Sequence, residues 1–251
     1  MDYGPRFPAC LNHPAVSGQL AMLIPFRSFI DALLDFVYPP LCVSCEKLLS
    51  RGQDHVCPEC WASIRHVSAG LPLFLETRDK LLATGVVDEL VSLYVFEKEG
   101  HFQKIVHSLK YSGVQAVGLE IGRQLGALLN EKGVRADALV PIPLHKRKLR
   151  ERGYNQSELI ARGISGVTHI PLRSDMIRRK KFTQTQTTLS LEERRNNMEE
   201  AFFCESSEVR GKTIILVDDI ITTGSTIQSC ADGLKKAGAL RIIAASAALA
   251  E

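Results

Sequence analysis

Hydrophobic positions along the chain predict alternating strands and helices from about residue 89 onward. Apolar runs predict buried strands at Leu90–Phe96, Ala138–Ile142, Ile214–Val217 and Arg241–Ala248, with a short strand beginning at Met176. Apolar residues at helical spacing predict helices at Phe102–Leu109, Gly118–Asn130, Ser157–Gly163 and Thr226–Ala237. Strands that alternate with helices are typical of an α/β fold with a doubly wound parallel sheet.

The first 88 residues follow a weaker pattern. Leu20–Val37 has apolar positions at helical spacing and predicts a short amphipathic helix, but three charged residues interrupt it, so no transmembrane span is expected. Val67–Thr84 shows little pattern and is expected to be a connector. We therefore expect an extension with a helix at residues 1–38, a cysteine module at 39–66, a connector at 67–88 and the α/β domain at 89–251.

Four cysteines in the second segment predict a metal site. Cys42 and Cys45 form one C-x2-C pair, and Cys57 and Cys60 form another after eleven intervening residues. Two such pairs can place four thiolates around one ion, which indicates structural Zn²⁺ in a zinc-ribbon-like module, with an Fe–S cluster as the alternative. A thioredoxin-like redox pair would need a βαβ context and a disulfide framework would need a secretory signal, and neither pattern is found in the sequence. His55 is a further candidate ligand in place of one thiolate. Reduced thiols beside a metal site favour a cytoplasmic protein.

The segment Ile214–Ile227 (IILVDDIITTGSTI) carries the strongest chemical signal. Asp218 and Asp219 follow a buried apolar run, and open α/β sheets bind ligands at the carboxyl ends of their strands. The next loop contains short hydroxyl side chains and a glycine just before a predicted helix, a combination that suits a phosphate group: Thr222, Thr223, Gly224, Ser225 and Thr226. The carboxylates match sugar hydroxyls or a metal beside that phosphate. A phosphorylated ribose would suit both the carboxylates and the hydroxyl-rich loop. The alternatives are a plain strand and turn, or a Mg²⁺-holding strand of a nucleotide triphosphatase.

Two basic segments precede this one in the chain. The first predicts an anion site after the strand that ends near Pro141, with Lys146, Arg147, Lys148, Arg150 and Arg152 followed by Gly153 and a helix cap at Asn155. A solvated basic turn and a nucleic-acid patch are the alternatives. The second is the polar stretch Arg178–Asn197, whose length is typical of a functional loop or a linker. The net charge of the 251-residue chain is only +3, so any affinity for nucleic acid must come from such local patches.

Together these motifs resemble the ComF family, phosphoribosyltransferase-like proteins that include competence and DNA-utilisation proteins. The resemblance runs from Tyr38 to the last strand and includes Leu109-Lys110-Tyr111, the run from Arg152 to Glu158, Thr185-Gln186 and the Asp218–Thr226 segment. It implies a type I phosphoribosyltransferase-like domain that binds phosphoribosyl pyrophosphate (PRPP). The first 20 or so residues depart from the family pattern.

The resemblance also implies residue roles. Asp218 and Asp219 would hold the ribose hydroxyls, and Thr222–Thr226 would hold the 5-phosphate. Lys146, Arg147, Arg150 and Arg152 would bind the pyrophosphate, with Mg²⁺ held largely by substrate oxygens and water. Lys180 and Lys181 would belong to a mobile catalytic loop.

Two functions remain open at this point. The first is pentosyl transfer from PRPP to an acceptor that the sequence does not identify; the chain ends soon after its last strand, so the cysteine module and Val67–Tyr111 would have to cover the site. The second is a single-stranded nucleic-acid-binding factor that kept the fold without turnover, with Tyr154 and Phe182 as candidate stacking groups. For either, the resemblance implies a role in DNA uptake, alongside the uptake machinery, or in the use of DNA as a nutrient.

Overall fold

A computed structural model describes residues 39–50, 52–179, 202–204 and 207–251. The predicted helix in Leu20–Val37, Phe182, and the candidate catalytic residues Lys180 and Lys181 lie outside these ranges. No helix in the described ranges has the length and apolar character needed to cross a membrane.

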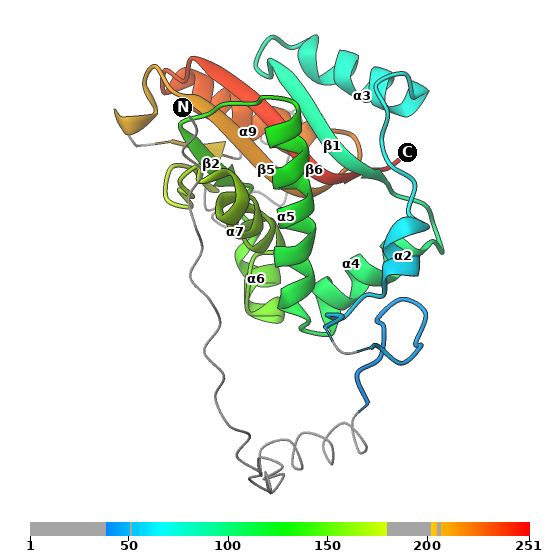
Figure 1. Ribbon diagram of the computed structural model, residues 1–251. Coiled ribbons are helices and arrows are strands. Elements are labelled where there is room, and N and C mark those ends of the chain that lie inside the picture. The colour runs from blue at the N-terminus through cyan, green and yellow to red at the C-terminus, as the bar shows by residue number, and fades with distance from the viewer. Residues whose placement is uncertain (1–38, 51, 180–201, 205–206) are drawn as a thin grey trace, which may run out of the picture. The chain divides into compact units, whose positions relative to one another are not determined.

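The sheet at the centre of the fold has four parallel strands (Figure 1). They are β1 (Glu89–Val95), β2 (Ala138–Pro141), β5 (Thr213–Ile221) and β6 (Arg241–Leu249), in the order β1-β6-β5-β2. The apolar runs explain why β5 and β6 lie at the centre, since a neighbouring strand on each side and helices on both faces leave little room for polar side chains. In β5 and β6 almost every residue is buried, apart from the stretch around the two aspartates.

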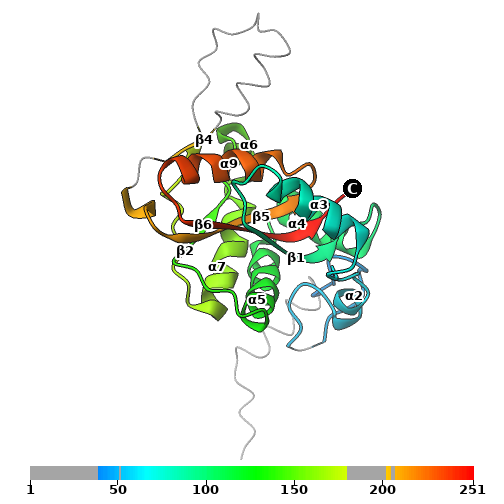
Figure 2. The ribbon, with the colours of Figure 1, turned by 90° about the horizontal axis from the view of Figure 1, so that it is seen from above.

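Helices cover both faces of the sheet, as the doubly wound prediction requires (Figure 2). On one face lie α5 (Gln115–Glu131) and α7 (Gln156–Thr168), and on the other α3 (Pro72–Leu82) and α9 (Ser225–Lys236). Helix α4 (His101–Tyr111) shares one hydrophobic cluster with α5 and α7. Successive residues of β5 alternate between the two cores: Ile215 and Val217 pack with α5 and α7, whereas Ile214 and Leu216 pack with α9. The α/β fold class is therefore confirmed.

Helices α5 and α7 approach each other closely enough to exclude side chains at two glycines. A Cβ atom on Gly122 would lie 2.1 Å from the carbonyl oxygen of Ile160, and one on Gly163 would lie 2.2 Å from that of Leu119. These distances are far below van der Waals contact, so the crossing depends on both glycines.

The cysteine module packs directly against the sheet domain. Leu41 and Leu48 form an antiparallel bridge, and α2 (Pro58–Ala62) begins directly after Cys57 and contains Cys60. Trp61 of α2 stacks on Tyr94 of β1 with ring centroids 6.2 Å apart. Buried cysteines of the module belong to the same hydrophobic cluster as α4 and α5.

Three local predictions need correction or extension. Val67–Thr84 contains helix α3, which the pattern missed because only Thr77 and Leu81 of that helix are buried. Strand β5 continues through Asp218 and Asp219 to Ile221, because β6 pairs with it over that length, so the two acids lie within the strand. The short strand expected from Met176 is β3 (Arg178–Arg179), paired antiparallel with β4 (Phe202–Phe203); a 3-10 turn at Ser207–Val209 precedes β5.

Candidate functional site

A pocket of about 620 Å³ opens where β2 has ended and β5 continues. Its walls come from α4, the loop after β2, the basic helix α6 (Lys146–Arg152), the start of α7, β3, β5 and the start of α9. This is the carboxyl edge of the parallel sheet, where α/β folds bind their ligands. Both predicted acids and part of the predicted basic segment line the same pocket.

The two aspartates form a hydrogen-bonded and ion-paired centre. The Ser157 hydroxyl donates to Asp218 Oδ1 at 3.1 Å, and the backbone N–H of Asp219 donates to the same oxygen at 2.9 Å. Lys110 Nζ lies 2.5 Å from Asp219 Oδ2, and both side chains of this ion pair are mostly buried. Lys110 comes from α4, more than 100 residues earlier in the chain, so only the tertiary structure brings it to the acids.

The two acids differ in how their negative charge is compensated. Burial, followed by the negative charge of Asp219, raises the pKa of Asp218 to about 7, against the opposing effects of the Asp219 N–H, Ser157 and Lys110. Asp218 therefore sits close to its ionisation point near neutral pH, while Lys110 neutralises its neighbour. Such a pair is poised to accept hydrogen bonds from ligand hydroxyls.

Helix α6 presents one of its faces to the pocket. Arg147, Lys148, Glu151 and Arg152 line it, a spacing that places them on one side of a helix. Lys146 and Arg150, which the sequence also nominated, do not line the pocket. The predicted turn is present: Gly153 ends α6 with a φ of 78°, and the Asn155 side chain caps α7 by accepting from Ser157 N–H.

The predicted phosphate loop joins β5 to α9 beside the acids. Gly224 has a φ of 76° and precedes the first helical residue, Ser225. A Cβ on Gly224 would lie 2.6 Å from a methyl carbon of Leu81, so this position requires glycine for both conformation and space. Of the loop residues, Thr226 lines the pocket, whereas Thr222, Thr223 and Ser225 do not, and all four are exposed.

Sequence reasoning missed several lining residues. Lys110 and Arg179 bring positive charge from other elements, and no local spacing connects them with the acids. Gln156 is 2% exposed, accepts from Arg152 at 2.8 Å, and its amide nitrogen has no hydrogen-bond partner among the described residues. Tyr154, a predicted stacking group, instead packs against the core, and its hydroxyl donates to the carbonyl oxygen of Leu109.

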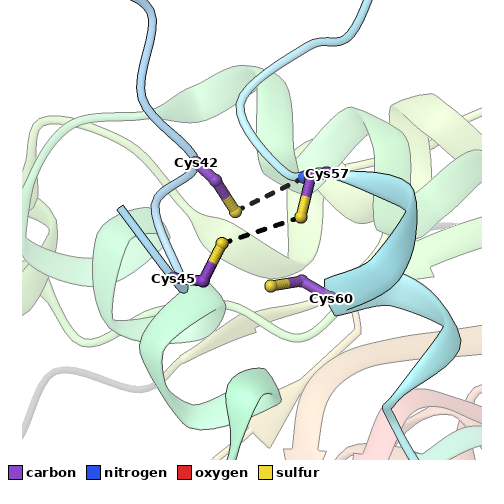
Figure 3. A group of neighbouring side chains, drawn as sticks. All are labelled: Cys42, Cys45, Cys57 and Cys60. Atoms are coloured by element: carbon purple, nitrogen blue, oxygen red, sulfur yellow. Dashed lines mark hydrogen bonds between the residues drawn. The ribbon is translucent and has the colours of Figure 1, made fainter. Parts of the chain in front are cut away.

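The second site is the predicted four-cysteine cluster (Figure 3). The sulfur atoms of Cys42, Cys45, Cys57 and Cys60 all lie within 4.8 Å of one another. Cys45 Sγ and Cys57 Sγ are 3.7 Å apart, close to the roughly 3.8 Å edge of a tetrahedron with Zn–S bonds of about 2.3 Å. The donor set and spacing fit structural zinc, and His55 does not belong to the cluster.

Surrounding groups prepare the thiols unequally for metal binding. Burial opposes ionisation of Cys42, but hydrogen bonds from backbone N–H groups, led by that of Cys57, lower its pKa to about 6. Burial raises the pKa of Cys60. Since thiolates are the metal-binding form, Cys42 is ready to bind at neutral pH, whereas Cys60 would lose its proton on binding.

Comparison with known proteins agrees with both sites. The phosphoribosyl transferase domain model matches residues 156–250, and the double zinc ribbon domain model matches residues 33–71. Competence protein F of Haemophilus influenzae is 38% identical over 41% of this chain and 45% of its own length. DNA utilization protein YhgH of Escherichia coli K12 is 33% identical over 55% of this chain and 63% of its own length.

A third relative extends the match along the chain. Competence protein ComFC of Bacillus subtilis is 28% identical over 79% of each chain. The chain thus spans about half to two thirds of the length of the first two relatives, and most of the third. Both domain models and all three relatives point the same way: the chain is similar to proteins of the ComF family, and a segment that matches a zinc ribbon precedes one that matches a phosphoribosyltransferase domain.

Proposed function

We propose that the pocket binds PRPP with Mg²⁺ and that the chain is a phosphoribosyltransferase-like protein. The carrying observation is the placement of Asp218 and Asp219 opposite the cationic face of α6, with the loop before α9 beside them. Carboxylates suit the ribose hydroxyls, the α9 start suits the 5-phosphate, and Arg147, Lys148 and Arg152 suit the pyrophosphate.

In this proposal the acids act on the ribose, and the basic residues act on the pyrophosphate that leaves it. Asp218 and Asp219 fix the ribose, and their negative charge favours the positive charge that develops at its ring. Arg147 and Arg152 stabilise the negative charge that grows on the departing pyrophosphate, and each such donor is typically worth about 10²–10³ in rate. Bound Mg²⁺ would neutralise part of the pyrophosphate charge. Lys180 and Lys181 stay candidates for a closing loop.

Calorimetry with PRPP and Mg²⁺ tests the binding proposal. Wild type should bind, and Asp218→Asn/Asp219→Asn should lose at least about tenfold in affinity, because two charged acceptors for the ribose are removed. Asp79→Asn, an exposed carboxylate on α3, is the control and should bind as wild type does. Equal affinity of the double variant and wild type, or no binding to either, rules the proposal out.

The acceptor is the next question. The pocket lining in the described part of the chain contains no Phe, Tyr or Trp to stack on a nucleobase. We therefore expect PRPP binding without efficient transfer to free adenine, guanine, hypoxanthine, uracil or orotate. Pyrophosphate release measured across those bases is the check, and robust turnover with any of them would overturn this expectation and identify the acceptor.

A second candidate function, binding of single-stranded nucleic acid, has its own observation. Tyr111 is 67% exposed, the Arg152 guanidinium lies 5.3 Å above its ring, and the His107 ring lies 4.7 Å away. This exposed stack continues from the pocket wall beside the charges of α6, and it offers a base-stacking surface next to phosphate-binding groups. The names of the relatives, competence and DNA utilization, are consistent with a cytoplasmic role in DNA uptake or use.

Anisotropy with a labelled single-stranded oligonucleotide tests this second function. Binding should weaken steeply with added salt, because phosphate contacts release counterions. Tyr111→Ala should lose about 1–3 kcal/mol of binding free energy, whereas Leu240→Ala, another exposed apolar side chain, should lose none. No binding at low salt, or binding indifferent to salt, would reject it. Competition by PRPP would show that both ligands use the same cations.

A further inference from the structure

Helix α4 connects the two sites of the molecule. At its first residue, His101 Nδ1 lies 2.7 Å from Ser44 Oγ and 3.6 Å from Cys60 Sγ. Ser44 lies between the cysteines of the first pair and is 2% exposed. The start of α4 is therefore fixed by the residues that surround the metal site.

The other end of α4 reaches the pocket. Lys110 makes the ion pair with Asp219, and the carbonyl of the adjacent Leu109 accepts a hydrogen bond from the Tyr154 hydroxyl. Lys110 lies nine positions after His101 in the same α-helix, a rise of about 14 Å. One short helix thus spans the distance between the cysteine cluster and the acidic pair.

One face of α4 is buried in the hydrophobic cluster that contains three of the metal-site cysteines. Phe102, Ile105, Val106 and Leu109 are each at most 3% exposed and share one hydrophobic cluster with Cys42, Cys57 and Cys60. Close-packed side chains transmit a displacement because they leave no space to absorb it. A shift of the cysteine module is therefore expected to reach Lys110.

Lys110 matters to the ligand because of its charge. Its ammonium group offsets the negative charge of Asp219, next to a second carboxylate, at the place where an anionic ligand must bind. Displacement of Lys110 would leave the two acids facing the ligand phosphates with less positive charge nearby, and it would free Asp219 to rotate.

We propose that α4 couples metal occupancy of the four-cysteine site to ligand binding in the pocket, with Lys110 as the residue that positions Asp219. The choice of PRPP as ligand rests on the proposed function, but the coupling itself does not. Because coupling between sites is reciprocal, zinc should tighten PRPP binding and PRPP should tighten zinc binding by the same factor.

Calorimetry and chelator competition on the full chain measure this factor. Zinc removal should weaken PRPP binding at least about fivefold, and saturating PRPP should raise the affinity for zinc equally. Lys110→Met should keep stoichiometric zinc, lose PRPP affinity and abolish the effect of PRPP on zinc. If Lys110 only stabilised the fold, Lys110→Met would leave the effect of PRPP on zinc affinity in place. Lys104→Met, the same substitution at an exposed position of α4, should behave as wild type.

A test variant and a matched control probe the start of α4, beside the metal site. Ser44→Ala removes the hydroxyl that contacts His101 and should lower PRPP affinity while zinc stays bound. Ser63→Ala removes a hydroxyl that donates to the Cys60 carbonyl, away from α4, and should not. If Ser44→Ala disturbs zinc binding, His101→Leu replaces it as the test. PRPP affinity that ignores zinc, Ser44 and His101 would overturn the coupling while leaving the proposed function intact.

Hydrogen exchange separates the two ideas if wild type fails to bind PRPP. That failure would count against the proposed function alone. The coupling still requires that zinc removal speed amide exchange at the far end of α4, around Leu109–Tyr111, and that Ser44→Ala do the same. Unchanged exchange there would overturn it without any ligand.

Discussion

At the scale of single residues, the pocket depends on how charge is shared between Asp218 and Asp219. Their side chains belong to consecutive residues, yet their partners differ: Asp218 receives hydrogen bonds from Ser157 and a backbone N–H, whereas Asp219 pairs with Lys110. One acid is therefore neutralised by a cation, and the other lies near its ionisation point at neutral pH. The pocket carries less negative charge than its composition suggests, which lowers the electrostatic cost of admitting a phosphorylated ligand.

This arrangement predicts a pH dependence of folding stability. Burial raises the pKa of Asp218 from 3.8 to about 7, so between these values the folded chain keeps a proton that the unfolded chain has released. The contribution of Asp218 to the free energy of unfolding must therefore fall as pH rises through this window, by at most about 1.4 kcal/mol per unit. Asp218→Asn should remove that contribution, and urea unfolding at intervals between about pH 5 and 8 measures it.

Two comparisons make this prediction specific to Asp218. Asp79→Asn alters an exposed carboxylate and should run parallel to wild type across the whole range. Above about pH 7 the wild-type slope attributable to Asp218 should vanish, since both states are then ionised. A variant at Asp218 whose stability changes with pH exactly as wild type does would show that the site is solvated rather than buried.

Residues near one another in sequence were the predictable part of the site. The run of apolar residues, acids and hydroxyls around Asp218 is local, and so are the four cysteines, so their spacing alone indicated their chemistry. Lys110 and Gln156 belong to motifs of the family resemblance but were given no site role, because their roles exist only after the chain has brought α4 and α7 to β5. Lys146 and Arg150 were also nominated but do not line the pocket, because a run of charges does not reveal which helix face turns inward.

At the scale of elements, the close crossing of α5 and α7 sets the position of the pocket wall. The start of α7 supplies Gln156 and Ser157 to the pocket, and α7 is held against α5 through Gly122 and Gly163. The sequence predicted these helices from their apolar spacing. It could not predict α3, whose two buried residues, Thr77 and Leu81, give no periodic stripe.

Gly122→Ala is expected to destabilise the fold despite the better helix propensity of alanine. The new methyl group would clash with the Ile160 carbonyl and force α5 away from α7, at a cost of about 1–3 kcal/mol from overpacking. Gly166→Ala, in α7 with nothing within 4 Å of its Cβ position, should instead gain up to about 1 kcal/mol. Urea unfolding compares the two, and equal stability of the variants would mean that the helices separate without cost.

At the scale of the whole molecule, the zinc ribbon and the sheet domain share one core. Independent folding of the metal module would be the simplest expectation from a cysteine-rich segment at one end of a chain. The structure instead places Cys42, Cys57 and Cys60 in one hydrophobic cluster with α4 and α5. The sheet keeps its second cluster, on the α9 face, which includes no cysteine of the metal site. Loss of metal should therefore loosen one side of the molecule without unfolding the sheet.

Trp61 offers a direct measurement of this partial loosening, because it is the single tryptophan of the chain. It follows Cys60 in α2 and stacks on Tyr94 of β1. Structural zinc contributes about 10–16 kcal/mol of apparent binding free energy, so Cys42→Ser should lose stoichiometric zinc and release α2 from β1. The expected result is a red shift of tryptophan fluorescence, with most of the far-ultraviolet circular dichroism retained. Cys230→Ser, a buried cysteine of α9 outside the cluster, should keep both zinc and the original fluorescence. The prediction is that the cysteine module needs the metal whereas the sheet folds without it. Retention of full zinc by Cys42→Ser, or loss of the whole circular dichroism signal, would contradict it.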